Sequence, residues 1–203
     1  MKIILLGSNG QLGKILTNFL NKKKKYSIYS LSKKNFNLLN IKKLEKYILK
    51  INPEIIINCV AFTNVDKAES KKKNSYDVNS NFLNSLSKLC KVNQCILFHF
   101  STDYVFDGSK NQKYIEEDSG NPLSIYGKSK YEGEKKIIRE CDNYIIFRVS
   151  WLFSEFNNNF FYFVINNIKN NKNIHAITDL KSIPTYSGEI ALFLKYFLEN
   201  YNY

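Results

Sequence analysis

A glycine-rich loop near the amino terminus constrains the fold more than any other feature of the sequence. Residues 7–13 read Gly-Ser-Asn-Gly-Gln-Leu-Gly. They directly follow residues 2–6, which are expected to form a strand and are apolar from residue 3 on. Residues 11–20 then have the apolar spacing of an amphipathic helix. Gly7, Gly10 and Gly13 allow a tight turn whose backbone N–H groups face a bound anion. We therefore predict a dinucleotide-binding loop, although the spacing G-x-x-G-x-x-G differs from the commoner G-x-G-x-x-G.

Apolar and amphipathic segments alternate along the rest of the chain. Further strands are expected at residues 26–30, 54–59, 95–100, 144–149 and 174–177, and helices at 41–50, 69–91, 124–140, 158–170 and 188–198. Residues 101–123 are expected to form a long functional loop. Strands that alternate with helices form a parallel sheet with right-handed crossovers. The predicted fold is α/β, a doubly wound parallel sheet (Rossmann fold), with a nucleotide-binding domain over residues 1–150 and a small, incomplete C-terminal substrate lobe over residues 151–203.

The net charge of +12 comes with lysine runs and an abundance of asparagine, tyrosine and isoleucine. This composition indicates a bias of the codons toward A and T and not a positively charged binding face, so we expect no nucleic-acid partner. No apolar run approaches the ~20 residues of a membrane helix, and the amino terminus lacks a signal peptide pattern. His99 and His175 lack the spacing of metal ligands, and the cysteines are scattered. We expect a cytoplasmic protein without a membrane partner or metal-ligating residues in the site, and with free thiols at Cys59, Cys90, Cys95 and Cys141.

The end of the second predicted strand bears on the choice of cofactor. NAD-binding proteins of this fold place an acidic residue here, where it binds the ribose 2′-hydroxyl. Residues 29–34 instead read Tyr-Ser-Leu-Ser-Lys-Lys. Hydroxyls such as that of Ser30, together with cations, suit a 2′-phosphate. The sequence favours NADPH, with NADH as the alternative if Lys33 and Lys34 only reflect the lysine-rich composition.

Tyr126 and Lys130 lie one helical turn apart at the start of a predicted helix. Reducing a ketone requires a hydride donor and an acid that protonates the developing alkoxide. A tyrosine hydroxyl can be that acid, and a neighbouring ammonium lowers its ordinary pKa of ~10. Thr102 follows the fourth predicted strand, where its hydroxyl can orient the substrate carbonyl. The alternative for Thr102 is a local turn or capping hydroxyl.

Six motif blocks, taken in order, resemble dTDP-4-dehydrorhamnose reductases. They read Gly-Gln-Leu-Gly at 10–13, Asn-Cys-Val-Ala-Phe-Thr at 58–63, Val-Asp-Lys-Ala-Glu at 65–69, Ser-Thr-Asp-Tyr-Val-Phe at 101–106, Tyr-Gly-Lys-Ser-Lys at 126–130 and Phe-Arg-Val-Ser-Trp at 147–151. The resemblance implies the NAD(P)H-dependent reduction of the C4 ketone of dTDP-4-dehydro-L-rhamnose, for surface polysaccharide synthesis. A related nucleotide-sugar epimerase is disfavoured because the blocks at 65–69 and 101–106 resemble the reductase.

The same resemblance assigns roles to individual residues. It implies a catalytic set of Thr102, Tyr126 and Lys130, and a substrate set of Thr102, Asp103 and Trp151. An aspartate that contacts the adenine side in the family is matched here by Asn37, followed by Leu38. The cofactor would also contact Gly10, Gln11, Leu12, Ala61, Phe62, Thr63, Tyr126 and Lys130.

Relatives in this family usually continue beyond the position of Tyr203 with more of the substrate lobe. We therefore expect either a homodimer or a chain that is shortened relative to its relatives, since residues 190–198 are apolar over much of a helix surface. A bridging Mg²⁺ stays open. Two alternatives to the reductase are a non-catalytic cofactor-binding subunit resembling the regulatory subunit of methionine adenosyltransferase, and a degenerate sugar-nucleotide reductase.

Overall fold

A five-stranded parallel sheet forms the centre of the molecule. The computed structural model describes residues 1–21, 25–156, 159–175 and 182–200. The strands have the order β2-β1-β3-β4-β5 and every pairing is parallel. The central strands are continuous apolar runs because both faces of a parallel sheet are covered. The strands are β1 (Lys2–Leu6), β2 (Ser27–Leu31), β3 (Ile55–Asn58), β4 (Ile96–Thr102) and β5 (Tyr144–Val149).

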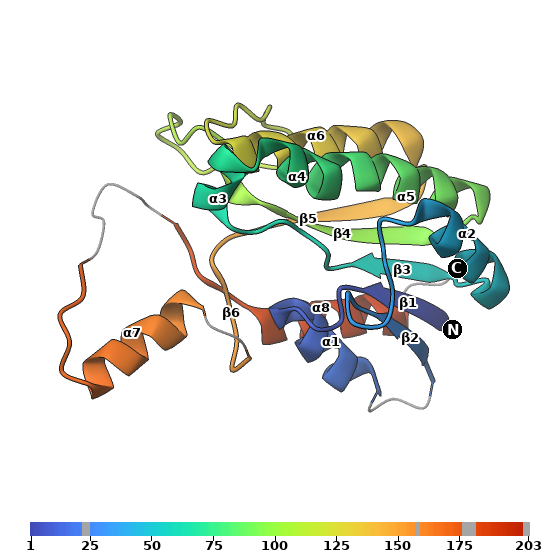
Figure 1. Ribbon diagram of the computed structural model, residues 1–203, viewed down its shortest axis with the longest axis horizontal. Coiled ribbons are helices and arrows are strands. Elements are labelled where there is room, and N and C mark those ends of the chain that lie inside the picture. Colours follow the sequence, from blue (N-terminus) through green and yellow to red (C-terminus); the bar gives the residue numbers. More distant parts are fainter. Residues whose placement is uncertain (22–24, 157–158, 176–181, 201–203) are drawn as a thin grey trace.

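Helices cover both faces of this sheet (Figure 1). Successive side chains of a strand point to opposite faces, so Ile4 and Leu6 pack in one core cluster while Ile3 and Leu5 pack in another. The first cluster includes side chains from α2 (Ile41–Ile51), α5 (Phe82–Val92) and α6 (Ile125–Glu140). The second includes side chains from α1 (Gln11–Asn21) and α8 (Ser187–Asn200). The predicted doubly wound α/β fold is confirmed.

The predicted helix over residues 69–91 is wrong as a single unit. The structure has α3 (Val65–Ser70), α4 (Lys72–Tyr76), the π-helical segment η1 (Asp77–Asn81) and α5. The helical region begins earlier than predicted because the Asn64 side chain accepts a hydrogen bond from the N–H of Lys67, which caps α3. Lys71, with φ −113° and ψ 45°, interrupts the helix.

The C-terminal segment contains two short strands that the sequence pattern does not predict. β6 (Leu152–Phe153) pairs in parallel with β7 (Thr185–Tyr186) in a separate small sheet. Residues 174 and 175 of the predicted strand 174–177 form no strand, and residues 176–177 lie outside the described residues. A 3₁₀ turn, η2 (Asp103–Val105), opens the long loop before α6.

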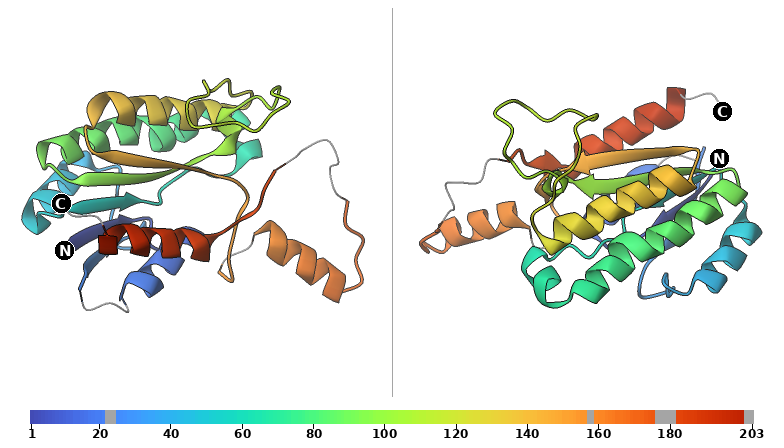
Figure 2. Two further views of the ribbon diagram at one scale, coloured as in Figure 1. Left: turned by 180° about the vertical axis from the view of Figure 1, so that it is seen from behind. Right: turned by 90° about the horizontal axis from the view of Figure 1, so that it is seen from above.

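Figure 2 shows α7 (Phe160–Lys169) standing apart from the two helix layers, whereas α8 returns along the sheet beside α1. Leu194 and Leu198 of α8 join the core formed with β1 and α1, so the end of the described chain is part of the main body. Within the described residues, no helix has both the length and the apolar character needed to cross a bilayer.

Candidate active site

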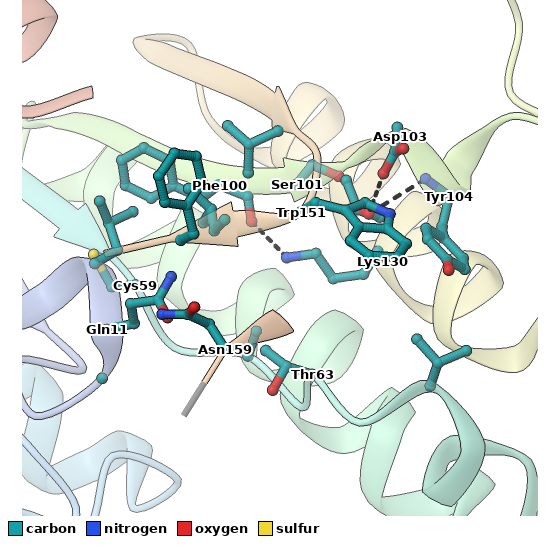
Figure 3. Close-up of a pocket in the computed structure, with 18 of the residues that line it drawn as sticks. Gln11, Cys59, Thr63, Phe100, Ser101, Asp103, Tyr104, Lys130, Trp151 and Asn159 are labelled. Carbon is teal, nitrogen blue, oxygen red and sulfur yellow. Dashed lines mark hydrogen bonds between the residues drawn. The ribbon is translucent and has the colours of Figure 1, made fainter. Parts of the chain in front are cut away.

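A cavity of about 670 Å³ lies at the carboxyl ends of the strands. This is where ligands bind in doubly wound sheets, and the volume is that of a small-molecule site. The wall comes from the glycine loop and α1, from the segments that follow β3, β4 and β5, and from α6 and α7 (Figure 3). Among the predicted site residues, the wall contains Gly10, Gln11, Leu12, Ala61, Thr63, Thr102, Asp103, Tyr126, Lys130 and Trp151.

Gly7 ends β1 with a backbone that only glycine fits. Its φ is +83°, and a Cβ there would lie 2.9 Å from the backbone carbonyl of Cys59. The turn leads into α1, in which Lys14 donates the first helical hydrogen bond, to Gly10. The N–H groups of residues 11–13 precede that bond, so the helix start can receive a phosphate group. This geometry fits the pyrophosphate of a dinucleotide.

Asn79 holds the segment that follows β3. Its side-chain oxygen accepts from the N–H of Phe62 at 2.8 Å, and its amide donates to the carbonyl of Phe62 at 3.1 Å. The same amide donates to the hydroxyl of Ser129 on α6 at 3.0 Å. Asn79 lies in η1, and single π-turns of this kind are frequent at functional sites. Sequence analysis did not identify Asn79, because nothing local distinguishes it from the other asparagines of the chain.

Thr102 and Asp103 stand at the carboxyl end of β4. The Thr102 hydroxyl donates to Asp103 Oδ1 at 3.2 Å and accepts from the N–H of Tyr104 at 3.3 Å. Thr102 thus caps η2, as the alternative interpretation held, and also lines the cavity. The other oxygen of Asp103 accepts from the hydroxyls of Ser150 at 2.8 Å and Ser182 at 2.9 Å. Asp103 therefore joins β4 to the C-terminal segment.

Tyr126 lies in the first turn of α6. The Ser124 hydroxyl accepts from the N–H of Gly127 at 3.0 Å and caps this turn. The Tyr126 ring meets the Tyr104 ring edge-on, with centroids 5.7 Å apart. Burial raises the pKa of Tyr126 to about 12, opposed by a hydrogen bond with Thr102. The pKa of Tyr126 is thus raised, and the predicted lowering by the neighbouring ammonium is wrong because burial dominates. The phenol keeps its proton at neutral pH and can act as an acid.

Lys130 is 1% exposed, one helical turn after Tyr126. Its ammonium donates to the carbonyl of Phe100 at 2.5 Å (Figure 3). Burial lowers the pKa of Lys130 to about 8, opposed by the charge of Glu134. An appreciable fraction of Lys130 can therefore be uncharged close to physiological pH, unlike an exposed lysine.

The C-terminal segment closes the outer side of the cavity. Trp151 has φ 44°, a left-handed conformation that is rare for a bulky residue and is found mainly where the surroundings impose it. Its ring meets that of Phe160 edge-on at 4.7 Å. Asn159, which caps α7, donates to the side chain of Gln11 at 3.2 Å. The start of α1 and the start of α7 are thus in direct contact.

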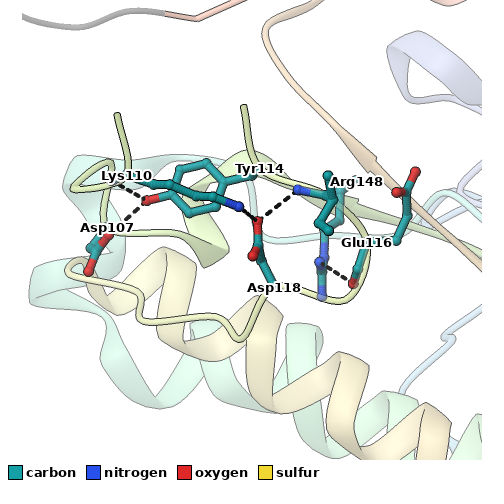
Figure 4. A network of polar contacts seen from close by, with 7 residues as sticks. Asp107, Lys110, Tyr114, Glu116, Asp118 and Arg148 are labelled. Atoms are coloured by element: carbon teal, nitrogen blue, oxygen red, sulfur yellow. Dashed lines mark hydrogen bonds and ion pairs between the residues drawn. The ribbon is translucent and has the colours of Figure 1, made fainter. Parts of the chain in front are cut away.

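A polar network holds the loop between β4 and α6 in place (Figure 4). Asp107 accepts from the hydroxyls of Ser109 at 2.7 Å and Tyr114 at 2.9 Å. These bonds, and others from the same loop, hold the pKa of Asp107 well below its usual range. Arg148, at the end of β5, donates to the carbonyl of Glu116 at 3.4 Å and to the carboxylate of Glu134 at 2.8 Å. The loop is thereby tied to both β5 and α6.

The remaining predicted cofactor residues do not line the cavity. Gly7 and Gly13 shape the turn behind it, and Phe62 is held by Asn79. Leu38 is 5% exposed and packs in the core beside α2. The residues placed away from the cavity wall are Gly7, Gly13, Ser30, Asn37, Leu38 and Phe62.

All four cysteines are free thiols, as predicted. Among the described residues, no group of three or more histidine, cysteine, aspartate or glutamate side chains is arranged to hold a metal ion.

Comparison with known proteins identifies the family. A family model described as the RmlD substrate binding domain matches residues 1–203. A dTDP-4-dehydrorhamnose reductase of Aggregatibacter actinomycetemcomitans is 36% identical over 190 residues, which cover 94% of this chain and 65% of that protein. One from Sinorhizobium fredii is 32% identical over 192 residues, covering 95% of this chain and 64% of that protein. The chain thus spans less than two thirds of the length of these curated relatives.

A solved structure agrees with this similarity. The crystal structure of dTDP-4-dehydrorhamnose reductase from Bacillus anthracis in complex with NADP matches with a TM-score of 0.93 and 34% identity, covering 98% of this chain and 70% of that chain. A related structure from Clostridium acetobutylicum matches with a TM-score of 0.92 and 31% identity, covering 100% of this chain and 72% of that one. The chain therefore belongs to the RmlD substrate binding domain family, and its predicted similarity to dTDP-4-dehydrorhamnose reductases is confirmed.

Proposed function

We propose that this protein reduces the C4 ketone of dTDP-4-dehydro-L-rhamnose to dTDP-L-rhamnose with NADPH. The observation that carries the proposal is the convergence of Thr102, Tyr126 and Lys130 on a cavity that also contains the start of α1. These residues have the chemistry that ketone reduction needs. The names of the relatives supply the class of substrate, and the complex of the Bacillus anthracis protein with NADP supports the cofactor.

The cofactor fits the amino-terminal side of the cavity. The helix start at residues 11–13 offers N–H groups for the pyrophosphate, and Ala61 and Thr63 line the same cavity. Lys33 and Lys34 are exposed just after β2, where a 2′-phosphate is recognised in this fold. These cations favour NADPH over NADH. When bound, NADPH supplies the hydride.

The chain's own residues supply the proton. Tyr126 is protonated at neutral pH, so its hydroxyl can give a proton to the oxygen that becomes negative as the hydride arrives. The Thr102 hydroxyl, which now donates to Asp103, can turn to donate to that same oxygen. A charged Lys130 one helical turn away stabilises the phenolate that Tyr126 becomes when it gives up this proton. Trp151 and Phe160 form an apolar wall on the side where the sugar nucleotide would lie.

The experiment follows NADPH oxidation in the presence of enzymatically generated dTDP-4-dehydro-L-rhamnose. Wild-type protein is expected to turn over with NADPH in preference to NADH. Tyr126→Phe keeps the ring but removes the acid, and is expected to lower kcat by about 10³-fold while NADPH still binds. Cofactor binding without any turnover in the wild type would contradict the proposal and support a non-catalytic or degenerate protein.

We also propose that the protein forms a homodimer. Aromatic side chains along α7 are about half exposed, with exposed fractions of 51% for Phe160, 54% for Phe161 and 52% for Phe163. Leu192 and Tyr196 on the outer face of α8 are exposed as well, at 52% and 67%. Apolar surface of this extent favours coverage by a second copy of the chain.

A further inference from the structure

Two buried polar side chains, Asn58 and His99, form a chain of contacts that ends at Lys130. Asn58 and His99 are paired residues of β3 and β4, and they are 0% and 1% exposed. They follow Ile56 and Leu97 by two residues and so point to the sheet face covered by α6. The Asn58 amide lies 3.0 Å from His99 Nδ1, and His99 Nε2 lies 3.4 Å from Lys130 Nζ. The mechanism derived above uses neither Asn58 nor His99.

The hydrogen bonds fix which nitrogen of His99 carries the proton. The backbone N–H of Val60 can only donate, and it donates to Asn58 Oδ1 at 3.1 Å. The NH₂ group of Asn58 therefore faces His99 and donates to Nδ1. Burial, and then the nearby charge of Lys130, hold the pKa of His99 well below its usual value, so the ring is neutral. A neutral ring whose Nδ1 accepts carries its hydrogen on Nε2.

This Nε2–H points at Lys130. A neutral amine has a lone pair that accepts such a bond, whereas an ammonium has none. The amine still has hydrogens to donate to the carbonyl of Phe100. Other groups that act on Lys130 are Glu134 on α6, which favours the charged form, and the thiol of Cys59, which burial keeps protonated. His99 is thus placed to stabilise the uncharged form of Lys130.

We propose that His99 is a positioning residue for proton return: held in the Nε2–H tautomer by Asn58, it stabilises the amine that Lys130 becomes on passing a proton back to Tyr126. The inference rests on the proposed reductase function. In each turnover the O–H bond of Tyr126 breaks as the product O–H forms. An N–H bond of Lys130 then breaks as the O–H of Tyr126 forms again, and solvent returns one proton to Lys130. The net uptake is one hydride and one proton.

The tautomer can be measured without any turnover. The chain has two histidines, so nitrogen NMR of histidine-labelled protein gives two imidazoles, and His175→Asn at an exposed position assigns them. We expect His99 to be neutral, with hydrogen on Nε2 and not on Nδ1, between about pH 5 and pH 8, where an unperturbed histidine changes its charge. Asn58→Asp keeps the acceptor for Val60 but cannot donate to Nδ1, so it is expected to move the hydrogen to Nδ1. A wild-type Nδ1–H tautomer or a charged ring would overturn the inference, even if the protein proves to be a reductase.

The pH profile of kcat tests the consequence for Lys130. In His99→Asn the new side chain still meets Asn58 but no longer reaches Lys130, so the amine loses its donor and the pKa of Lys130 rises. Turnover requires protonated Lys130, so kcat is expected to fall at alkaline pH as this proton is lost. In His99→Asn the midpoint of this fall is expected to move up by about one pH unit, with less than about twofold change in KM for NADPH. His99→Gln, which restores a donor near the position of Nε2, should bring the fall back. An unmoved alkaline fall in His99→Asn would contradict the role of His99.

Discussion

At the scale of single residues, the charge of Lys130 costs the folded chain stability. Burial lowers its pKa from 10.5 to about 8, so the folded chain binds this proton more weakly than the unfolded chain does. This cost in stability is fully present below the pKa of Lys130 in the folded chain. It disappears as the pH rises toward the pKa of Lys130 in the unfolded chain. Lys130→Met is expected to abolish turnover while raising the free energy of unfolding at neutral pH by about 2 kcal/mol.

Denaturant unfolding across a pH series checks this prediction. The increase in the free energy of unfolding caused by Lys130→Met should become smaller as the pH rises from the pKa of Lys130 in the folded chain to its pKa in the unfolded chain. Lys73→Met is the matched control because the Lys73 side chain is 89% exposed, and it should change stability by less than about 0.5 kcal/mol. A gain that is the same at every pH would show that packing, and not the buried charge, is responsible.

The residues proposed to react could be predicted from local patterns, but the residues that hold them could not. Tyr126 and Lys130 share one turn of α6, so their spacing in the sequence is also their spacing in space. Asn58 and His99 are 41 residues apart along the chain and meet only through the pairing of β3 with β4. Asn79 likewise reaches Phe62 across 17 residues. Such contacts leave no periodic signal in a sequence.

At the scale of elements, one ion pair joins α6 to β5. The Glu134 side chain is 1% exposed and the Arg148 side chain 24%, and Arg148 donates to both carboxylate oxygens. Glu134→Gln keeps the shape but removes the charge, leaving a guanidinium that is only partly hydrated. We expect a loss of about 2 kcal/mol in the free energy of unfolding, less than for a fully buried pair because Arg148 retains some solvent.

Thermal or denaturant unfolding measures this loss. The matched control is Asp142→Asn, which neutralises an ion pair with Lys91 in which the side chains are 54% and 68% exposed. That change should be below about 0.5 kcal/mol. Equal effects of the two substitutions would mean that Glu134 and Arg148 contribute no more than a surface pair. The loop ordered by Arg148 (Figure 4) would then depend on its own hydrogen bonds.

At the scale of the whole molecule, the proposed homodimer predicts a concentration-dependent mass. Sedimentation velocity at increasing concentration is expected to show a dimer. Phe163→Lys, on the half-exposed surface of α7, should weaken association because it places a charge in an apolar interface. Phe161, which lines the cavity, is left intact so that the site is preserved. A single monomeric species at high concentration would contradict the dimer.

The sequence by itself determined the α/β class, the boundaries of β1 and β5, the glycine turn and the spacing of Tyr126 and Lys130 within α6. Each of these depends on residues close together in the chain, where periodicity, capping and turn chemistry act directly. Only the tertiary structure decided that Lys71 interrupts the long helical region, that β6 pairs with β7, and that Leu38 lies in the core. It also decided that a buried histidine lies beside Lys130, because burial and the contacts between β3, β4 and α6 exist only once distant segments have packed together.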